Sequence, residues 1–258
     1  MSVLTSRDNP KVKRWAKLAS DARFRRSERR ALIEGPHLLA AALQHGCRPV
    51  AVLATEEGAT DTEISRLIAE SALRPVLLSK SIFRMVVDSE TPQGVAAEIA
   101  IPEAGRQADA PAVFLENVQD PSNVGAILRS AAAFGVKFVV LDRACADAWS
   151  PKALRAGMGG HFALRIDETD NLDADLERFK GSVACAVPKG GVNLRDAPLK
   201  GPLGWVFGGE GRGLSEHTLA RATVRVTIPM AAGSESLNVA AAAAICLCET
   251  FSTSGAGS

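Results

Sequence analysis

The apolar and polar positions along the chain predict an α/β protein, and the pattern is clearest after residue 111. Short apolar runs, typical of buried strands, alternate there with segments whose apolar residues recur every three or four positions, as on one face of a helix. Strands are predicted at 112–115, 137–141, 183–187, 203–207 and 224–228, and helices at 123–134, at 151–157, from about 214, and from about 236 to 251. This alternation indicates a mostly parallel sheet with helices covering both faces.

The first hundred residues predict a separate and smaller α/β unit. Its strands are predicted at 50–54, 76–78 and 94–99, and its helices at 11–19, 36–44 and 62–72. Residues 101–111 hold two prolines, a glycine and polar residues, a composition typical of a linker. We therefore expect an N-terminal domain over 1–100, a linker over 101–111, and a C-terminal domain over 112–258 that folds without the first 105 residues.

Composition excludes several classes of protein. The 258 residues are 47% hydrophobic and 23% charged, which is the balance of a soluble globular protein. No apolar run approaches the ~20 residues that span a bilayer, and the N-terminus lacks the apolar core of a signal peptide. The five cysteines are an odd number without a C-x-x-C pair, which favours reduced thiols in a cytosol over a zinc cluster. We expect a cytoplasmic protein with no membrane segment and no metal.

Charge is distributed unevenly, although the net charge is only +1. Residues 1–30 hold ten Lys or Arg and three Asp or Glu, whereas the rest of the chain holds more acids than bases. A basic end on an otherwise acidic chain suggests a polyanion such as nucleic acid as a partner, the alternative being a solvated helix face. The predicted contacts to such a polyanion in this basic end are Arg7, Lys11, Lys13, Arg14, Arg25 and Arg26.

Residues 116–129 form the first of three segments with candidate chemistry. They leave the carboxyl end of a predicted strand and enter a predicted helix, and in parallel α/β sheets ligands bind at that edge. Asn123 would either belong to a site or only cap the helix. Arg129 has Gly125 and Ala133 four residues away on the same helical face. These small neighbours leave room for a ligand to approach the guanidinium, unless Arg129 is an ordinary surface residue.

The second segment is a glycine-rich loop at residues 207–213, again after an apolar strand. Gly208 and Gly209 would let a ligand come close to the backbone, and Glu210 would orient an arginine or accept a hydrogen bond. The spacing does not meet the G-x-G-x-x-G pattern of dinucleotide-binding folds, which argues against a nicotinamide-dependent enzyme. The alternative is a glycine-rich turn with a solvated glutamate.

The third segment, residues 228–239, leads from a predicted strand into the alanine-rich last helix. Ser236 and Asn238 lie at the start of this helix, where free N–H groups and the helix dipole favour electron-rich groups. The alternative is that Ser234 or Ser236 only caps the helix.

Taken in order, these segments carry the patterns N-x-G-x-x-x-R, G-G-E-G-x-G and I-P-M-x-x-x-x-x-S-L-N-V. In this order they resemble the three motifs of the SpoU/TrmH family within the SPOUT class of RNA methyltransferases, over roughly residues 112–251. Residues 151–161 are similar to a further segment of the family, although Gly157 stands where serine is common. Residues 6–13 and 33–39 look like the α/β substrate-binding domain that family members carry before the methyltransferase domain.

The resemblance implies a fold and an activity. The C-terminal parallel-sheet domain would contain a deep trefoil knot, which periodicity alone does not predict because knots are nearly absent from proteins. It would form a homodimer, for which the last helix, apolar around most of its circumference, is suited. The activity would be the transfer of a methyl group from S-adenosylmethionine to a ribose 2′-hydroxyl of rRNA or tRNA, with no metal.

The resemblance also implies roles for individual residues. The matching cofactor contacts are Gly208, Gly209, Val187, Ile228 and Leu237. The matching polar positions of the catalytic site are Asn123, Arg129, Glu210, Ser236 and Asn238. Because a guanidinium is not deprotonated in proteins, we expect Arg129 to bind the ribose and the adjacent phosphate, with Glu210 orienting it.

The sequence indicates the type of RNA substrate less clearly than it indicates the reaction. The separate N-terminal domain favours rRNA, because tRNA-specific relatives more often carry short basic extensions. Two alternatives stay open: a tRNA 2′-O-methyltransferase, and a non-catalytic RNA-binding assembly factor on the same fold.

Overall fold

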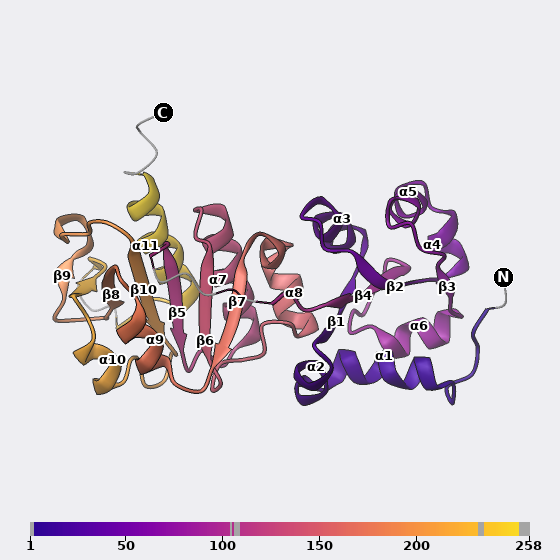
Figure 1. The fold of residues 1–258 in the computed structure, drawn as a ribbon, viewed down its shortest axis with the longest axis horizontal. Helices are drawn as coiled ribbons and strands as arrows, with labels where there is room; N and C mark the ends of the chain where they lie inside the picture. Colours follow the sequence, from indigo (N-terminus) through magenta and orange to yellow (C-terminus); the bar gives the residue numbers. More distant parts are fainter. Residues whose placement is uncertain (1–2, 104, 106–108, 232–234, 253–258) are drawn as a thin grey trace. The chain divides into compact units, whose positions relative to one another are not determined.

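The computed structural model describes residues 3–103, 105, 109–231 and 235–252. The chain divides into two compact units, which Figure 1 shows: residues 1–102 with 147–162, and residues 103–146 with 163–258. The predicted linker at 101–111 contains this division, and its residues 104 and 106–108 lie outside the described part. The first unit takes in the segment 147–162, which we expected in the C-terminal domain.

The first unit is built on a four-stranded mixed sheet with the order β1-β4-β2-β3. Strand β4 runs antiparallel to β1 and β2, and β3 runs parallel to β2. The strands are β1 (Arg30–Glu34), β2 (Pro49–Ala54), β3 (Val76–Leu77) and β4 (Val95–Ala100). The helical segments are α1 (Pro10–Ser20), α2 (Ala22–Glu28), α3 (Pro36–Gln44), α4 (Glu56–Thr60), α5 (Thr62–Glu70), α6 (Lys80–Val86), α8 (Pro151–Gly157) and the 3-10 turn η1 (Gly160–Ala163).

The buried core of this unit explains the spacing of the apolar residues along α1. Val12, Trp15 and Leu18 recur every three residues along α1 and are buried in one cluster with Phe83 of α6 and Leu53 of β2. Apolar side chains at this spacing share one face of a helix, so α1 can bury its apolar face while its lysines stay in solvent.

The second unit is a seven-stranded sheet with the order β7-β6-β5-β10-β8-β11-β9, and every neighbouring pair is parallel. The strands are β5 (Ala112–Glu116), β6 (Phe138–Asp142), β7 (Arg165–Thr169), β8 (Ser182–Ala186), β9 (Val192–Asn193), β10 (Leu203–Gly208) and β11 (Val224–Thr227). The helical segments are α7 (Pro121–Ala133), α9 (Leu172–Arg178), η2 (Leu194–Asp196), α10 (Glu216–Ala220) and α11 (Val239–Ser252).

Helices cover both faces of this sheet, as two adjacent residues of the central strand β10 show. Val206 is buried in a cluster with Leu176 of α9 and Leu219 of α10. Trp205 points to the opposite face, since successive side chains of a strand alternate, and its Nε1 donates to Oγ1 of Thr250 on α11 at 3.1 Å. Helix α11 also packs against α7 (Figure 1). The prediction of a parallel sheet covered on both faces is confirmed for this unit.

Several short elements were not predicted, among them β1, β7 and β9 and the helices α2, α4, α6 and α9. Each of these helices is only five to seven residues long. A helix of that length shows less than two turns of periodicity, so its pattern is hard to separate from a loop.

Candidate active site

The three candidate segments meet at one edge of the seven-stranded sheet. Strands β5, β10, β8 and β11 are consecutive in the sheet and parallel, so their carboxyl ends lie along the same edge. The first segment leaves β5, the glycine loop leaves β10, Val187 follows β8 and Ile228 follows β11. This is the edge at which open parallel sheets bind ligands.

A chain of side-chain hydrogen bonds joins the three segments to one another. Nδ2 of Asn238 donates to Oδ1 of Asn123 at 3.0 Å, and Nδ2 of Asn123 donates to Oε1 of Glu210. Oδ1 of Asn238 in turn accepts from the backbone N–H groups of Ala240 and Ala241 at 2.9 and 3.2 Å. Since each amide uses its donor and its acceptor, the network fixes the orientation of both asparagines.

The helix caps decide between the alternatives left open for Asn123 and for Ser236. Helix α7 begins at Pro121 and is capped by Asp120, whose side chain accepts from the N–H of Ser122 at 2.8 Å. Asn123 is therefore free to serve the polar network. The cap of α11 is Asn238, two residues after Ser236, so Ser236 is not the cap and precedes the helix as an exposed residue. Ser234 lies outside the described residues.

Close backbone packing explains two of the glycines of the second segment. A Cβ on Gly209 would lie 2.0 Å from the carbonyl oxygen of Asn117, and one on Gly208 would lie 2.4 Å from the carbonyl carbon of Gly213. Gly209 also donates its N–H to the carbonyl of Glu116 at 2.9 Å. Close packing between the first and second segments thus requires glycine at 209, and close packing within the glycine loop requires glycine at 208.

Arg129 stands apart from this network. It lies six residues after Asn123 on α7, a rise of about 9 Å along the helix axis, and its side chain is exposed. It makes no hydrogen bond or ion pair with any residue that the structure describes. Glu210 accepts from Asn123, and the expected pairing of Glu210 with Arg129 is not seen among the described residues.

Apolar side chains at the same edge are incompletely covered. Leu237, next to Asn238, is 38% exposed, and Ile228 and Val187 are half-buried. Val187 is fixed by its N–H, which donates to the carbonyl of Val226 at 2.9 Å. Partly exposed apolar side chains beside backbone polar groups suit a flat aromatic ring with hydrogen-bonding edges.

Sequence reasoning missed the residues that hold the first segment in place. The carboxylate of Asp142, at the end of β6, accepts from the N–H of Asn117 at 3.1 and 3.0 Å and from the N–H of Cys145 at 2.9 Å. Asn117 has a left-handed backbone, with φ of +55°, and Oε2 of Glu116 accepts from the N–H of Ser215 at 3.0 Å. Their position in the sequence could have identified them, because Glu116 and Asp142 each end a buried strand at the ligand-binding edge.

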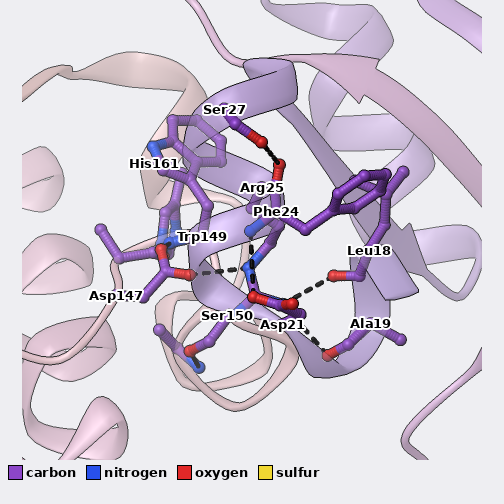
Figure 2. A network of polar contacts seen from close by, with 12 residues as sticks. Leu18, Ala19, Asp21, Phe24, Arg25, Ser27, Asp147, Trp149, Ser150 and His161 are labelled. Carbon is purple, nitrogen blue, oxygen red and sulfur yellow. Dashed lines mark hydrogen bonds and ion pairs between the residues drawn. The ribbon is translucent and has the colours of Figure 1, made fainter. Parts of the chain in front are cut away.

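Arg25 is wrongly predicted as an RNA contact. Its side chain is 4% exposed, and its Nε donates to Oδ2 of Asp147 at 2.6 Å (Figure 2). Its Nη1 donates to the carbonyls of Leu18 and Ala19 at 2.6 and 3.1 Å. The same carboxylate accepts from the N–H of Trp149 through Oδ1 at 2.9 Å. All these groups belong to the first unit, so Arg25 holds the segment 147–162 in that unit.

The other predicted RNA contacts remain at the surface to different degrees. Arg7 and Lys11 are exposed, Lys13 is exposed and pairs with Asp8 at 2.8 Å, and Arg26 is half-buried. Arg14 donates to Glu28 and to the buried carboxylate of Glu98, both at 2.8 Å. Arg14 therefore contributes to the fold of the first unit, whatever else it binds.

Among residues 3–103, 105, 109–231 and 235–252, no helix is long and apolar enough to cross a bilayer. Within the same residues, no group of three or more His, Cys, Asp or Glu side chains is placed to hold a metal ion.

Comparison with known proteins agrees with this architecture. Residues 110–248 match the SpoU rRNA Methylase family, and residues 9–97 match the MRM3-like substrate binding domain. The 23S rRNA (guanosine(2553)-2'-O)-methyltransferase RlmP of Bacillus subtilis is 31% identical over 95% of this chain and 97% of its own length.

Solved structures show the same fold over nearly the whole chain. A crystal structure of an RNA 2'-O ribose methyltransferase is 29% identical, with a TM-score of 0.81 over 98% of this chain and 99% of that chain. The SpoU methyltransferase AviRb from Streptomyces viridochromogenes, in complex with AdoMet, has a TM-score of 0.84 at 22% identity over 96% of this chain and 100% of its own. The family predicted from the three motifs is confirmed, and the chain belongs to the SpoU rRNA methylase family.

Proposed function

We propose that this protein transfers a methyl group from S-adenosylmethionine to the 2′-hydroxyl of a ribose in rRNA. The observation that carries the proposal is the hydrogen-bonded chain from Asn238 through Asn123 to Glu210, which joins the three segments at the carboxyl edge of the parallel sheet. The full-length similarity to a 23S rRNA 2'-O-methyltransferase supports ribose as the target and rRNA as the substrate.

The residues at this edge fit the proposed cofactor. S-adenosylmethionine, when bound, supplies a sulfonium methyl group that a hydroxyl oxygen can attack directly. The partly exposed side chains of Leu237, Ile228 and Val187 would hold the adenine faces. Gly208 and Gly209 would present backbone N–H and carbonyl groups to its polar edges.

Arg129 is proposed to act on the RNA rather than on the cofactor. Its guanidinium is exposed and unpaired among the described residues, and its planar fork can bind two oxygens of a ribose and its phosphate at once. A cation held there would stabilise the negative charge that develops on the 2′-oxygen as its proton leaves. Asn123, Glu210, Ser236 and Asn238 would position the loops around the hydroxyl.

The first unit is proposed to select the RNA. It matches a substrate-binding domain over residues 9–97, and its helix α1 exposes Lys11 and Lys13. Basic side chains on one element bind the phosphate backbone and give a salt-dependent affinity.

A direct assay tests the activity and the choice of RNA. The purified protein is incubated with methyl-labelled S-adenosylmethionine and, separately, with unmodified transcripts of 23S rRNA, 16S rRNA and a tRNA pool, and 2′-O-methylated positions are mapped. We expect one site in rRNA. Labelling of tRNA alone would establish the tRNA alternative, and tight RNA binding without labelling of any RNA would establish the assembly factor.

Three finer features belong to the same proposal. A homodimer is supported by the outer face of α11, where Ala241, Ile245 and Cys248 are exposed in one stripe, and light scattering at micromolar concentration tests it. A trefoil knot in the second unit is supported by family membership, and a shortened contour length in single-molecule unfolding tests it. A cytoplasmic location is supported by the proposed rRNA substrate, and cell fractionation tests it.

A further inference from the structure

One residue, Glu116, holds the glycine loop from both sides of Glu210. Its backbone carbonyl accepts from the N–H of Gly209 at 2.9 Å, and Oε2 of its carboxylate accepts from the N–H of Ser215 at 3.0 Å. Glu116 is the last residue of β5, and its register partner Gly208 is the last residue of β10. The loop that leaves β10 is therefore tied to the end of the neighbouring strand at two points.

The contact with Ser215 also completes the cap of helix α10. Ser215 is the N-cap of this helix, and its Oγ accepts from the N–H of Thr218 at 3.2 Å. In a capping box, the backbone N–H of the N-cap residue donates to a Glu or Gln three residues later. Thr218 occupies that position here, so the carboxylate of Glu116, 99 residues away along the chain, takes the place of the capping-box glutamate.

Between these two contacts the loop closes on itself. The N–H of Gly213 donates to the carbonyl of Gly209 at 3.0 Å, which closes a turn around Glu210. Within this turn, Oε1 of Glu210 accepts from Nδ2 of Asn123. The position of the Glu210 carboxylate therefore depends on a turn that Glu116 holds on both sides.

The backbone at Glu116 is itself fixed before and after the residue. Strand β5 pairs with β10 on one side and with β6 on the other. The next residue, Asn117, donates its N–H to both carboxylate oxygens of Asp142, at 3.1 and 3.0 Å. Glu116 is thus a rigid point from which a side chain can hold a neighbouring loop.

We propose that Glu116 is a positioning residue for the methyl transfer, an inference that rests on the proposed function. It keeps Glu210 in contact with Asn123, and it keeps in place the backbone of Gly208 and Gly209 that would contact the cofactor. Its carboxylate acts in this role as a hydrogen-bond acceptor for Ser215 and not as a base. A displacement of about 1 Å far from the reacting atoms can cost about 10²-fold in rate, so a loop released at Ser215 would affect both binding and chemistry.

The test compares Glu116→Ala, which removes the acceptor, with Glu116→Gln, whose side-chain carbonyl can still accept from Ser215. Amide hydrogen exchange followed by NMR reports on the loop, and calorimetry with S-adenosylmethionine reports on the site. Both use the full-length protein at a temperature where thermal melting shows every variant folded. In Glu116→Ala we expect about tenfold faster exchange of the Ser215 amide and about tenfold weaker cofactor binding. Glu116→Gln should stay within about threefold of the wild type in both, because it loses only the charge of the acceptor.

The rescue by glutamine separates a positioning role from a purely structural or a charge-dependent one. In single-turnover methylation with saturating cofactor and RNA, Glu116→Ala should be about tenfold slower than the wild type, and Glu116→Gln should recover most of the rate. The control Glu177→Ala removes an exposed carboxylate on α9 and should match the wild type in every measurement.

Three results would overturn the inference. Unchanged exchange of the Ser215 amide in Glu116→Ala would show that Glu116 does not hold the loop, and this measurement needs neither cofactor nor RNA. Faster exchange with unchanged cofactor affinity and rate would reduce Glu116 to a structural residue, and an equal loss in Glu116→Gln and Glu116→Ala would assign the effect to charge. A wild-type protein that binds no S-adenosylmethionine would instead overturn the proposed function.

Discussion

Nε of Arg25 lies 2.6 Å from Oδ2 of Asp147, a residue 122 positions later in the chain, and both side chains are buried. This ion pair belongs to a compact unit made of two chain segments, 1–102 and 147–162. The first unit therefore includes residues that come after two strands of the second sheet, β5 and β6, along the chain.

Breaking this pair should destabilise the protein. In Arg25→Met the carboxylate of Asp147 stays buried without its cation, a change that commonly costs about 3–5 kcal/mol. Urea unfolding measures the loss, and Arg7→Met, at an exposed position of the same basic end, should change the free energy of unfolding by less than about 0.5 kcal/mol. A value for Arg25→Met as small as that of Arg7→Met would contradict a structural role for Arg25.

Removal of residues 1–102 should expose the segment 147–162 rather than release a well-folded domain. Trp149, Leu154 and His161 are buried, and the unit to which they belong loses its sheet in this truncation. We expect the fragment 103–258 to bind a hydrophobic dye and to unfold at lower urea than the full chain. Co-expressed fragments 1–102 and 103–258 should copurify, since the first unit needs both, and their failure to associate would argue for independent domains.

Protonation of His161 should destabilise the protein in mild acid. Its Nε2 lies 2.7 Å from the carbonyl oxygen of Ala148 and must donate to it. Burial lowers the pKa of His161 to about 4, although the hydrogen bond to Ala148 and the negative charge of Asp147 act to raise it. The unfolded chain binds this proton near its ordinary pKa of 6.5, so stability is complete above pH 6.5 and is lost as pH falls towards 4. The slope is at most about 1.4 kcal/mol per pH unit.

The variant His161→Gln isolates this contribution, because its amide can still donate to the carbonyl of Ala148 but does not titrate. Urea unfolding at several pH values should show a shallower loss of stability between pH 6.5 and 4 for the variant than for the wild type. Parallel pH profiles of the two proteins would show that His161 is not the group responsible.

Sequence patterns predicted the residues of the candidate site better than they predicted which distant residues pack against one another. The motif order located Asn123, Glu210 and Asn238, which the structure brings into hydrogen-bond contact. Composition could not distinguish Arg25 from the exposed Lys and Arg residues around it, because the burial of Arg25 depends on a partner more than a hundred residues away. The same holds for α8, whose boundaries were predicted correctly from its own residues but whose packing partner was not.

The glycine loop offers a matched pair of substitutions. In Gly209→Ala the new Cβ would lie 2.0 Å from the backbone oxygen of Asn117, so the loop must shift, at a cost of about 1–3 kcal/mol. Such a shift would also move Glu210 away from Asn123 and weaken cofactor binding. Gly211→Ala meets no atom within 4 Å and should be nearly neutral. Urea unfolding and calorimetry with S-adenosylmethionine measure both effects, and equal behaviour of the two variants would contradict the packing argument.

Arg129→Ala is the sharpest test of the proposed chemistry. If Arg129 binds the ribose and its phosphate, its loss should slow the chemical step about 10²–10⁴-fold in single-turnover methylation with saturating cofactor and RNA. Cofactor affinity should change little, because the adenosine would be held by the loops around Gly208, Ile228 and Leu237. Arg129→Lys should restore little of the rate, since an ammonium lacks the planar fork that spans two oxygens.

A second arginine supplies the control for this experiment. Arg178 is exposed on α9, which covers the face of the sheet opposite to α11, and Arg178→Ala should leave the rate unchanged. Because Arg129 makes no hydrogen bond or ion pair with any described residue, Arg129→Ala should melt at the wild-type temperature, so a slow rate would reflect chemistry and not unfolding. A wild-type single-turnover rate in Arg129→Ala would exclude Arg129 from the reaction and leave the joined side chains of Glu210, Asn123 and Asn238 as the groups that act on the hydroxyl.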